Sequence, residues 1–261
     1  MLNNQYESAM AKLLYIGVPF VSIFLVTSPV TDPVNVTKFL ALGGVGFASL
    51  SLFLARGLTR GASESKAPIV LVVLFVVFSI ISVFMSDLPF AQNLYGVYGR
   101  NTGFMTYLFL TGLLLGALSL QKFESFRGIF FGLLFTGAIN VIYCAWVIFF
   151  GDFIGWNNPY GNILGLFGNP NFIGAFLGIW ISATVGYLLG ATLQTWQRMV
   201  VIALLTLSLF AVYKSHAVQG VVVTAAGIAT VGFFYIRSKT KGWAIVTLYS
   251  GAVLSLSLIH I

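Results

Sequence analysis

Residues 67–85 read APIVLVVLFVVFSIISVFM, an apolar run without a charged side chain. About 20 consecutive apolar residues cross the hydrocarbon core of a bilayer as a helix, so this run predicts a membrane-spanning helix. Eight further runs of similar character lie at 11–27, 37–55, 103–120, 128–150, 172–192, 199–213, 217–236 and 243–260. We therefore expect an all-α, polytopic transmembrane helical bundle of about nine spans, forming a single transmembrane domain over residues 1–261.

The composition excludes an ordinary soluble enzyme. Of the 261 residues, 59% are hydrophobic and 7% are charged, and the mean hydropathy is +0.98. Soluble domains carry about 25% charged residues. The net charge of +7 does not predict a nucleic-acid partner, because the basic residues are spread over short gaps. The single cysteine, Cys144, excludes an internal disulfide. The sequence contains no metal-ligand cluster and no Walker motif, so we expect neither a metal nor a nucleotide cofactor.

The gaps between the runs alternate between basic and nearly neutral, which predicts the orientation of the chain. One set of gaps holds ten of the thirteen basic residues, and the other holds only Lys38, Arg100 and Lys214. Cytoplasmic gaps are enriched in Lys and Arg, so we expect a cytoplasmic N-terminus and three cations at the outer face. The first run lacks a convincing cleavage site and is expected to remain as a helix.

Small residues recur at intervals of four in several runs. The longest series is Gly174, Gly178, Ser182, Gly186 and Gly190, and the pairs Gly112/Gly116 and Gly128/Gly132 repeat the pattern more weakly. Such a series lies on one helix face and lets a neighbouring helix approach closely. We therefore interpret these residues as packing positions.

Two outer gaps contain candidates for anion binding. Arg100 precedes the run at 103–120, where it either reaches lipid headgroups or grips phosphate oxygens bidentately. Asn169 and Pro170 have the chemistry of an N-cap and a first helical residue. The plain interpretation is a helix start. The functional interpretation is that the free N–H groups at this helix start, near Asn171, also bind a diphosphate.

The other two outer segments fit either a ligand-binding role or a purely structural one. The gap at 151–171 combines aromatic residues with amides, which suit sugars but also suit a loop in the membrane interface. In the turn at 214–216, Lys214 and His216 either bind an anion or are merely solvated, and His216 is a weak candidate for an acid or base.

These outer motifs, in this order, resemble the O-antigen ligase and polymerase family of bacterial envelope proteins. The resemblance rests on YGRNTG at 98–103, on GLFGNPN at 165–171, and on Ser215 followed by Gln219 and Gly220. The run FGNPN is its most specific part.

The resemblance implies a multi-pass protein of the bacterial inner (plasma) membrane. Family members transfer or polymerise glycans carried on undecaprenyl diphosphate, to a hydroxyl of a glycan, of a lipid such as the lipopolysaccharide core, or of a protein. The hydroxyl attacks the anomeric carbon and the lipid diphosphate leaves, with no metal or nucleotide cofactor in the ligase branch. Substrate-binding roles are implied for Arg100, Asn169, Asn171, Lys214 and Gln219.

Two features depart from the family pattern. Ligase-like members often have an arginine after the serine of the later outer turn, where this chain has His216. The large outer loop that carries catalysis in the family follows further spans, whereas this sequence ends at Ile261. We therefore expect an N-terminal fragment without the large periplasmic loop and last helices, inactive on its own.

Two other classes of function are open. A transporter or flippase for lipid-linked glycans fits a bundle of many helices, although no run contains the carboxylates typical of ion-coupled transport. A non-catalytic membrane assembly factor fits as well.

Overall fold

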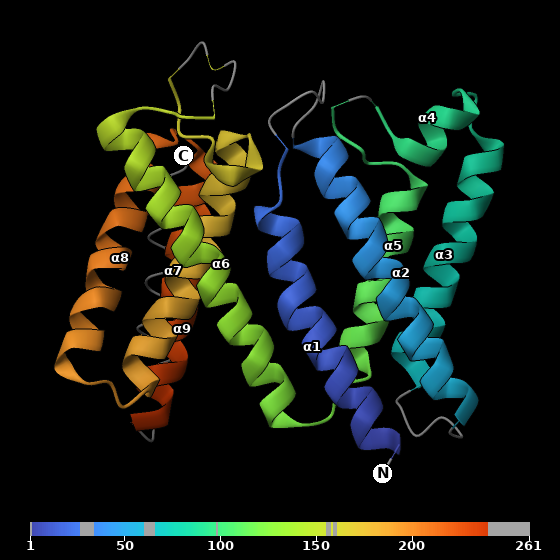
Figure 1. The fold of residues 1–261 in the computed structure, drawn as a ribbon, viewed down its shortest axis with the longest axis horizontal. Coiled ribbons are helices and arrows are strands. Elements are labelled where there is room, and N and C mark those ends of the chain that lie inside the picture. The colour runs from blue at the N-terminus through green and yellow to red at the C-terminus, as the bar shows by residue number, and fades with distance from the viewer. Residues whose placement is uncertain are drawn as a thin grey trace. The chain divides into compact units, whose positions relative to one another are not determined.

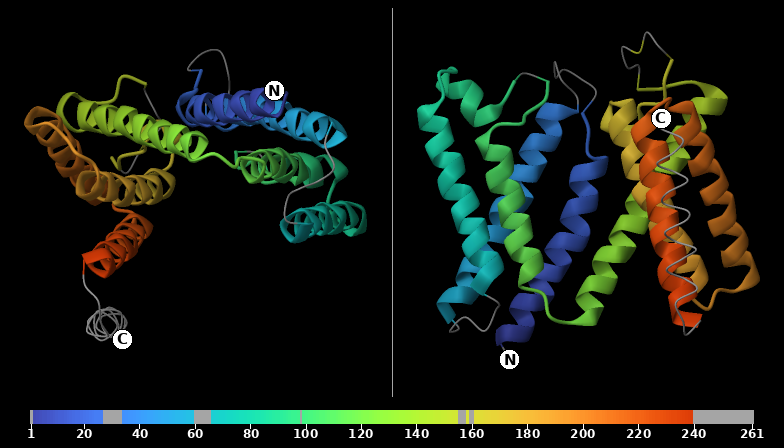
Figure 2. Two further views of the ribbon diagram at one scale, coloured as in Figure 1. Left: turned by 90° about the horizontal axis from the view of Figure 1, so that it is seen from below. Right: turned by 180° about the vertical axis from the view of Figure 1, so that it is seen from behind.

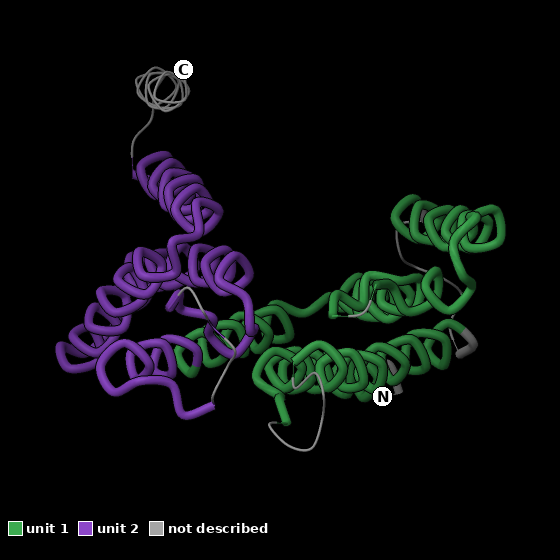
Figure 3. The backbone as a smooth tube through the Cα atoms, turned by 90° about the horizontal axis from the view of Figure 1, so that it is seen from above, with its two compact units in different colours: residues 1–139 green, residues 140–261 purple. Residues whose placement is uncertain are grey.

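The computed structural model describes residues 2–26, 34–59, 66–97, 99–154, 158 and 161–239. All regular elements among these residues are helices, which confirms the predicted all-α class (Figure 1). By its internal contacts the chain divides into two compact units, residues 1–139 and residues 140–261 (Figure 3). The prediction of one transmembrane domain over the whole chain stays a prediction.

Unit 1 is built mainly around α2 and α5. Its elements are α1 (Leu2–Ile23), α2 (Asn35–Thr59), α3 (Lys66–Met85), α4 (Phe90–Tyr95), α5 (Phe104–Leu118) and the first part of α6 (Phe123–Phe150). Helix α2 packs against α1 and α5, and α3 packs against α4 and α5. The short α4 lies within a gap in which the sequence predicted no helix.

Unit 2 is built around α7. Its elements are the rest of α6, the short 3₁₀ helix η1 (Gly165–Phe167), α7 (Pro170–Gly190), α8 (Thr195–Lys214) and α9 (Val218–Lys239). Helix α7 packs against both α8 and α9 (Figure 2). Its central residues Leu177, Trp180 and Ile181 are almost completely buried.

Eight of the nine predicted apolar runs fall on helices, seven of them of 20 residues or more, and the run at 243–260 lies outside the described residues. Six helices of the described part are long and apolar enough to cross a membrane: α2, α3, α6, α7, α8 and α9. Helix α5 is apolar but has only 15 residues. The chain thus has the architecture of a multi-pass membrane protein, while the count of nine spans and the cytoplasmic N-terminus stay predictions.

The contact between α2 and α5 depends on glycine, as the Gly112/Gly116 pattern predicts. A Cβ atom on Gly46 would lie 2.7 Å from the carbonyl oxygen of Phe109, and one on Gly116 would collide with the hydroxyl of Ser49 in α2. The buried Ser49 hydroxyl donates to the carbonyl oxygen of Gly112 at 2.8 Å. Small residues therefore let the two backbones touch and form a hydrogen bond between helices.

The predicted small-residue face of α7 is confirmed over its first half. A Cβ atom on Gly174 would lie 3.0 Å from the Cβ atom of Ala217, and one on Gly178 would lie 2.9 Å from the backbone nitrogen of Thr224. Across from Ser182 lies Gly227 of α9. The series then opens, because the nearest atom to a Cβ on Gly186 is 3.8 Å away and none lies within 4 Å of one on Gly190.

Two charged side chains cap the two helix ends that meet at the turn between α5 and α6. A carboxylate oxygen of Glu7 accepts hydrogen bonds from the backbone N–H groups of Gln121 at 3.0 Å and Lys122 at 2.6 Å, just before α6 begins. The guanidinium of Arg56 donates to the carbonyl oxygen of Ser119, where α5 ends. An anion thus lies at a helix N-terminus and a cation at a helix C-terminus, the favourable arrangement for both helix dipoles.

Lys38 makes a third cap of this kind. Its ammonium group donates to the carbonyl oxygens of Val21, at 3.1 Å, and of Ser22 in the last turn of α1. One of the three cations predicted at the outer face therefore joins α2 to the C-terminal end of α1.

Replacing Gly178 by leucine tests the close approach of α7 and α9. We expect Gly178→Leu to lower the free energy of unfolding by about 1–3 kcal/mol, because the larger side chain collides with the backbone of α9. Gly186→Leu is the matched control, since the nearest atom to a Cβ there is a Val231 side-chain carbon at 3.8 Å rather than backbone, and leucine favours the helix. Equal thermal unfolding of the two variants in detergent would show that the glycine face does not set the packing.

Replacing Glu7 by glutamine tests the cap of α6. Burial by itself raises the pKa of the Glu7 carboxyl. This effect is outweighed by the hydrogen bonds from the N–H groups of Lys122 and Gln121 and from the Ser125 hydroxyl, and by the charge of Lys122. The pKa of Glu7 therefore lies below its ordinary value of 4.5. The ionised carboxylate therefore stabilises the folded state when the pH is above the ordinary pKa. This stabilisation is lost as the pH falls through the lowered pKa of the folded state.

We expect Glu7→Gln to cost about 1 kcal/mol at neutral pH and less in acid. Thermal unfolding in detergent at pH 7 and at pH 3 measures the difference. Glu124→Gln, which changes an exposed carboxylate in the first turn of α6, is the control. A cost of Glu7→Gln that does not shrink in acid would contradict the capping role of the charge.

Candidate functional site

In unit 1, the segment from Gly96 to Gly103 forms a tight loop that carries Arg100. Gly96 has a left-handed backbone with φ of 87°, and a Cβ atom there would lie 2.7 Å from the backbone nitrogen of Gly103. The two glycines therefore let the ends of the loop touch. Between them, the N–H of Arg100 donates to the carbonyl oxygen of Val97 at 3.0 Å, and the Arg100 side chain is exposed.

Asn101 is a residue of this loop that sequence reasoning did not single out as a site. It has a left-handed backbone with φ of 46°, and its carbonyl oxygen accepts from the hydroxyl of Thr106. Its side-chain nitrogen is buried and has no acceptor among the described residues. Tyr98, the first residue of the motif, lies outside the described residues.

The loop borders a groove of about 570 Å³ between α3, α4 and α5. Aromatic side chains line part of this groove, and hydroxyls and amides line the rest; the polar members are Ser79, Ser82, Ser86, Gln92, Asn93 and Thr102, and the aromatic ones are Phe75, Phe78, Phe104 and Tyr107. Backbone of the loop, at Gly96 and Gly103, closes one edge. The groove thus offers apolar and hydrogen-bonding surface together, next to an exposed arginine.

The serines of α3 carried the signal that could have revealed this groove. Ser79, Ser82 and Ser86 follow one another at spacings of three and four, so they share one helix face. They are also the only hydroxyls in or directly after the apolar run that predicted α3. Asn93 supports the polar end, because its amide donates to the carbonyl oxygens of Val83 at 3.1 Å and Leu88 at 3.3 Å.

In unit 2, the motif at 165–171 folds as η1 followed by the start of α7. Gly168 has the left-handed backbone that ends η1, and Asn169 is the N-cap of α7 with Pro170 as its first residue. The Asn169 side chain accepts from the N–H groups of Asn171 at 2.9 Å and Phe172 at 3.4 Å. The predicted helix start is confirmed. An anion at this end stays a prediction, and it would have to displace the Asn169 cap.

The turn after α8 holds the other predicted residues of unit 2. Lys214 and Gln219 are exposed, and so is His216, which has a left-handed backbone with φ of 54°. The Lys214 ammonium lies 5.7 Å from the centroid of the Phe210 ring. Beneath them Ser215 is buried, and its hydroxyl donates to the carbonyl oxygen of Val212 at 2.7 Å. Ser215 therefore shapes the turn, while its neighbours face outward.

The structure brings five of the six predicted residues to one end of unit 2. The start of α7 packs on the turn, because Gly174 lies against Ser215, Ala217 and Gly220. The N–H of Ile163 in the preceding loop donates to the carbonyl oxygen of Lys214 at 3.4 Å. The residues gathered at this end are Asn169, Asn171, Lys214, His216 and Gln219. Arg100 belongs to unit 1, and its convergence with them stays a prediction.

Asn140 anchors the loop that leads to this end, and sequence reasoning missed it. It lies in α6, is fully buried, and accepts at its side-chain oxygen from the N–H of Leu166 at 3.3 Å. A lone amide inside the apolar run at 128–150 was the available signal. Further along α6, the Tyr143 hydroxyl donates to the carboxylate of Asp152 at 2.8 Å. Non-helical backbone beside membrane helices requires such partners.

The gap at 151–171 therefore packs partly against its own unit. Ile163 and Leu166 are buried, and the Phe167 ring lies 5.0 Å from that of Phe176 in α7. Trp156, Asn157 and Tyr160, which suggested a sugar-binding surface, lie outside the described residues. Within the described part of the chain, no group of three His, Cys, Asp or Glu side chains is placed to hold a metal ion.

Comparisons with protein-family models, with curated protein sequences and with solved structures gave no match. The resemblance to the O-antigen ligase and polymerase family therefore rests on the quoted motifs alone.

Replacing Asn169 by alanine tests the cap of α7. We expect Asn169→Ala to cost about 1 kcal/mol of stability, because the N–H groups of Asn171 and Phe172 lose their acceptor. Hydrogen exchange at these two amides should become faster. Asn169→Asp, which keeps an acceptor oxygen, is the control and should leave the exchange nearly unchanged. Unchanged exchange in Asn169→Ala would mean that the side chain does not cap the helix.

Proposed function

We propose that the protein takes part in membrane glycan transfer, as a ligase or polymerase that moves a glycan from an undecaprenyl-diphosphate-linked donor to a hydroxyl acceptor. The transfer occurs at the outer face of the bacterial inner membrane. The observation that carries the proposal is the groove between α3, α4 and α5, which combines aromatic and hydroxyl-bearing walls and borders the loop of Arg100.

A lipid-linked glycan is an amphiphile, and the groove has matching chemistry. Its aromatic side chains suit the isoprenoid chain, and its hydroxyls and amides suit a diphosphate or the first sugar. The buried amide nitrogen of Asn101, which has no acceptor among the described residues, is a further donor for an anionic oxygen. Arg100, its neighbour in the chain, supplies a planar pair of donors for phosphate.

The reaction needs positive charge where the leaving group forms. The acceptor oxygen bonds to the anomeric carbon, and the bond to the diphosphate breaks with the electron pair on the diphosphate. Cations and N–H donors that face the departing diphosphate oxygen stabilise the negative charge that develops on it and lower the barrier. Of the three cations predicted at the outer face, Lys38 caps α1, whereas Arg100 and Lys214 are exposed. We assign Arg100, whose loop borders the groove of unit 1, to the diphosphate, and Lys214 to the substrate-binding end of unit 2.

The acceptor hydroxyl must also lose its proton. His216 stands on an exposed turn beside Lys214 and close to the start of α7, where its imidazole is placed to accept a proton. Asn171 and Gln219 are exposed amides at the same end of unit 2. We assign this end to the acceptor and to the departing proton, with Asn169 holding the start of α7 in place.

A flippase for lipid-linked glycans is the alternative, because a groove for a lipid-linked donor serves translocation as well as transfer. The two functions differ in their product. Proteoliposomes with the complete protein and a fluorescent undecaprenyl-diphosphate glycan distinguish them, since transfer creates a new glycosidic bond and flipping moves the donor unchanged.

Replacing Arg100 by alanine tests the proposed donor site. We expect Arg100→Ala in the complete protein to lower glycan transfer by about 100-fold or more while the protein still enters the membrane, because one charged donor to the leaving group is lost. Arg100→Lys should restore only part of the rate, since lysine keeps the charge but not the paired donors. Arg127→Ala, at an exposed arginine of α6, is the matched control. Unchanged transfer in Arg100→Ala would remove Arg100 from the donor site.

A further inference from the structure

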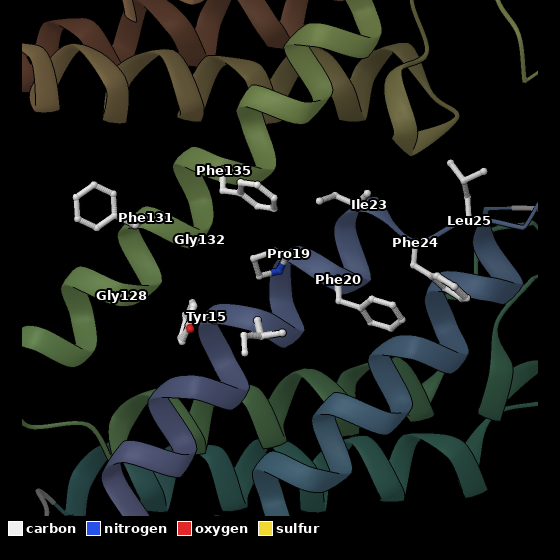
Figure 4. A pocket seen from close by; sticks show the side chains of 11 residues that line it. Tyr15, Pro19, Phe20, Ile23, Phe24, Leu25, Gly128, Phe131, Gly132 and Phe135 are labelled. Carbon is white, nitrogen blue, oxygen red and sulfur yellow. The ribbon is translucent and has the colours of Figure 1, made fainter. Parts of the chain in front are cut away.

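Two neighbouring cavities run along α1 and α6 within unit 1. The first, of about 670 Å³, is lined almost entirely by apolar side chains, and Figure 4 shows Pro19, Ile23 and Phe135 in the space between the two helices. The second, of about 420 Å³, is lined by charged and hydroxyl side chains near the start of α6. Tyr15 and Gly128 line both cavities. Together they form one groove with a polar end and an apolar end, here called the α1/α6 groove.

Glycine at two positions of α6 explains the shape of the α1/α6 groove. At Gly132 the helices touch, because a Cβ atom there would lie 2.8 Å from the carbonyl oxygen of Tyr15. One turn earlier, at Gly128, a Cβ atom would have only the Tyr15 side chain near it, at 4.0 Å. The Gly128/Gly132 pair is therefore a close contact at one position and an opening at the other.

The polar end of the α1/α6 groove carries balanced charge. Its lining includes the cations Lys12 and Lys122 and the carboxylates Glu7 and Glu124. Glu7 is buried and already caps α6, whereas Lys12, Lys122 and Glu124 are exposed. A purely anionic group would meet two carboxylates there. A group with both a phosphate and an ammonium meets a partner for each of its charges.

We propose that the α1/α6 groove binds a zwitterionic glycerophospholipid with a phosphoethanolamine headgroup. Its phosphate lies between Lys12 and Lys122, its ammonium faces Glu124, and one acyl chain passes Tyr15 and Gly128 into the apolar cavity. This lipid site is separate from the groove next to the Arg100 loop, and it depends on neither glycan transfer nor flipping. The bound chain fills the space that Gly128 leaves open and so supports the contact of α6 with α1.

Native mass spectrometry of the complete protein released from detergent tests the proposal with added phosphatidylethanolamine. Gly128→Leu places a side chain at the junction of the two cavities, where nothing lies closer than 4.0 Å to its Cβ atom. We expect retained phosphatidylethanolamine to fall at least about tenfold, because the chain loses its buried contacts. Gly44→Leu is the matched control, a helical glycine of α2 with nothing within 4 Å. Equal retention by the two variants overturns the site.

The headgroup is tested by competition with phosphatidylglycerol, which has the phosphate but lacks the ammonium. The unchanged protein should retain phosphatidylethanolamine in preference, and Glu124→Gln should remove that preference while the total lipid retained stays similar. Replacing Lys12 and Lys122 together by glutamine should lower the retention of both lipids. A preference for phosphatidylglycerol in the unchanged protein, or an unaltered preference in Glu124→Gln, overturns the proposed headgroup.

Discussion

Unit 1 depends on hydrogen-bonding groups at helix ends finding partners on other helices. The turn between α5 and α6 is the clearest case, because Glu7 from α1 binds the N–H groups before α6 and Arg56 from α2 binds the carbonyl at the end of α5. Both side chains are buried. Where a helix end is shielded from water, an unsatisfied N–H or carbonyl group is costly, and a charged partner also interacts favourably with the helix dipole. Two cross-links of this kind tie α1 and α2 to one short turn, and Lys38 ties α2 to α1 at the other end of α1.

Unit 2 meets the same requirement with neutral groups. Asn169 caps α7, Ser215 shapes the turn before α9, and the buried Asn140 holds the loop at Leu166. Amides and hydroxyls cost less to bury than charges. The cation of this unit's turn, Lys214, is exposed. The two units also share one device, since each joins its closest pair of helices through small residues, at Gly46 in unit 1 and at Gly178 in unit 2.

The sequence predicted the helices well because a long apolar run has one stable form in a bilayer. It also predicted the glycine contacts and the Asn169 cap, because both depend on residues only two to four apart. It did not predict the capping roles of Glu7, Arg56 and Lys38, because Arg56 and Lys38 entered only the count of basic residues that predicts the orientation, and Glu7 had no assigned role. Their partners lie far away in the chain, 114 residues from Glu7 to Gln121 and 63 from Arg56 to Ser119, so no local pattern records them. The polar groove was only half recorded locally: Ser79, Ser82 and Ser86 share one face of α3, but Thr102 comes from the loop before α5, which joins them only in the fold.

The length of α5 has a consequence for the surrounding lipid. A helix rises about 1.5 Å per residue, so its 15 residues span about 22 Å, against about 30 Å for the 20 residues of the adjacent α3. The second value matches the hydrocarbon thickness of a typical bilayer and the first does not. If α5 crosses the bilayer as its apolar run predicts, this hydrophobic mismatch would draw the headgroups inward around it, or place one end of it below the level of its neighbours. Local thinning there would shorten the distance between a lipid phosphate and the loop of Arg100, so the thickness of the host membrane becomes a variable that sets access to the arginine.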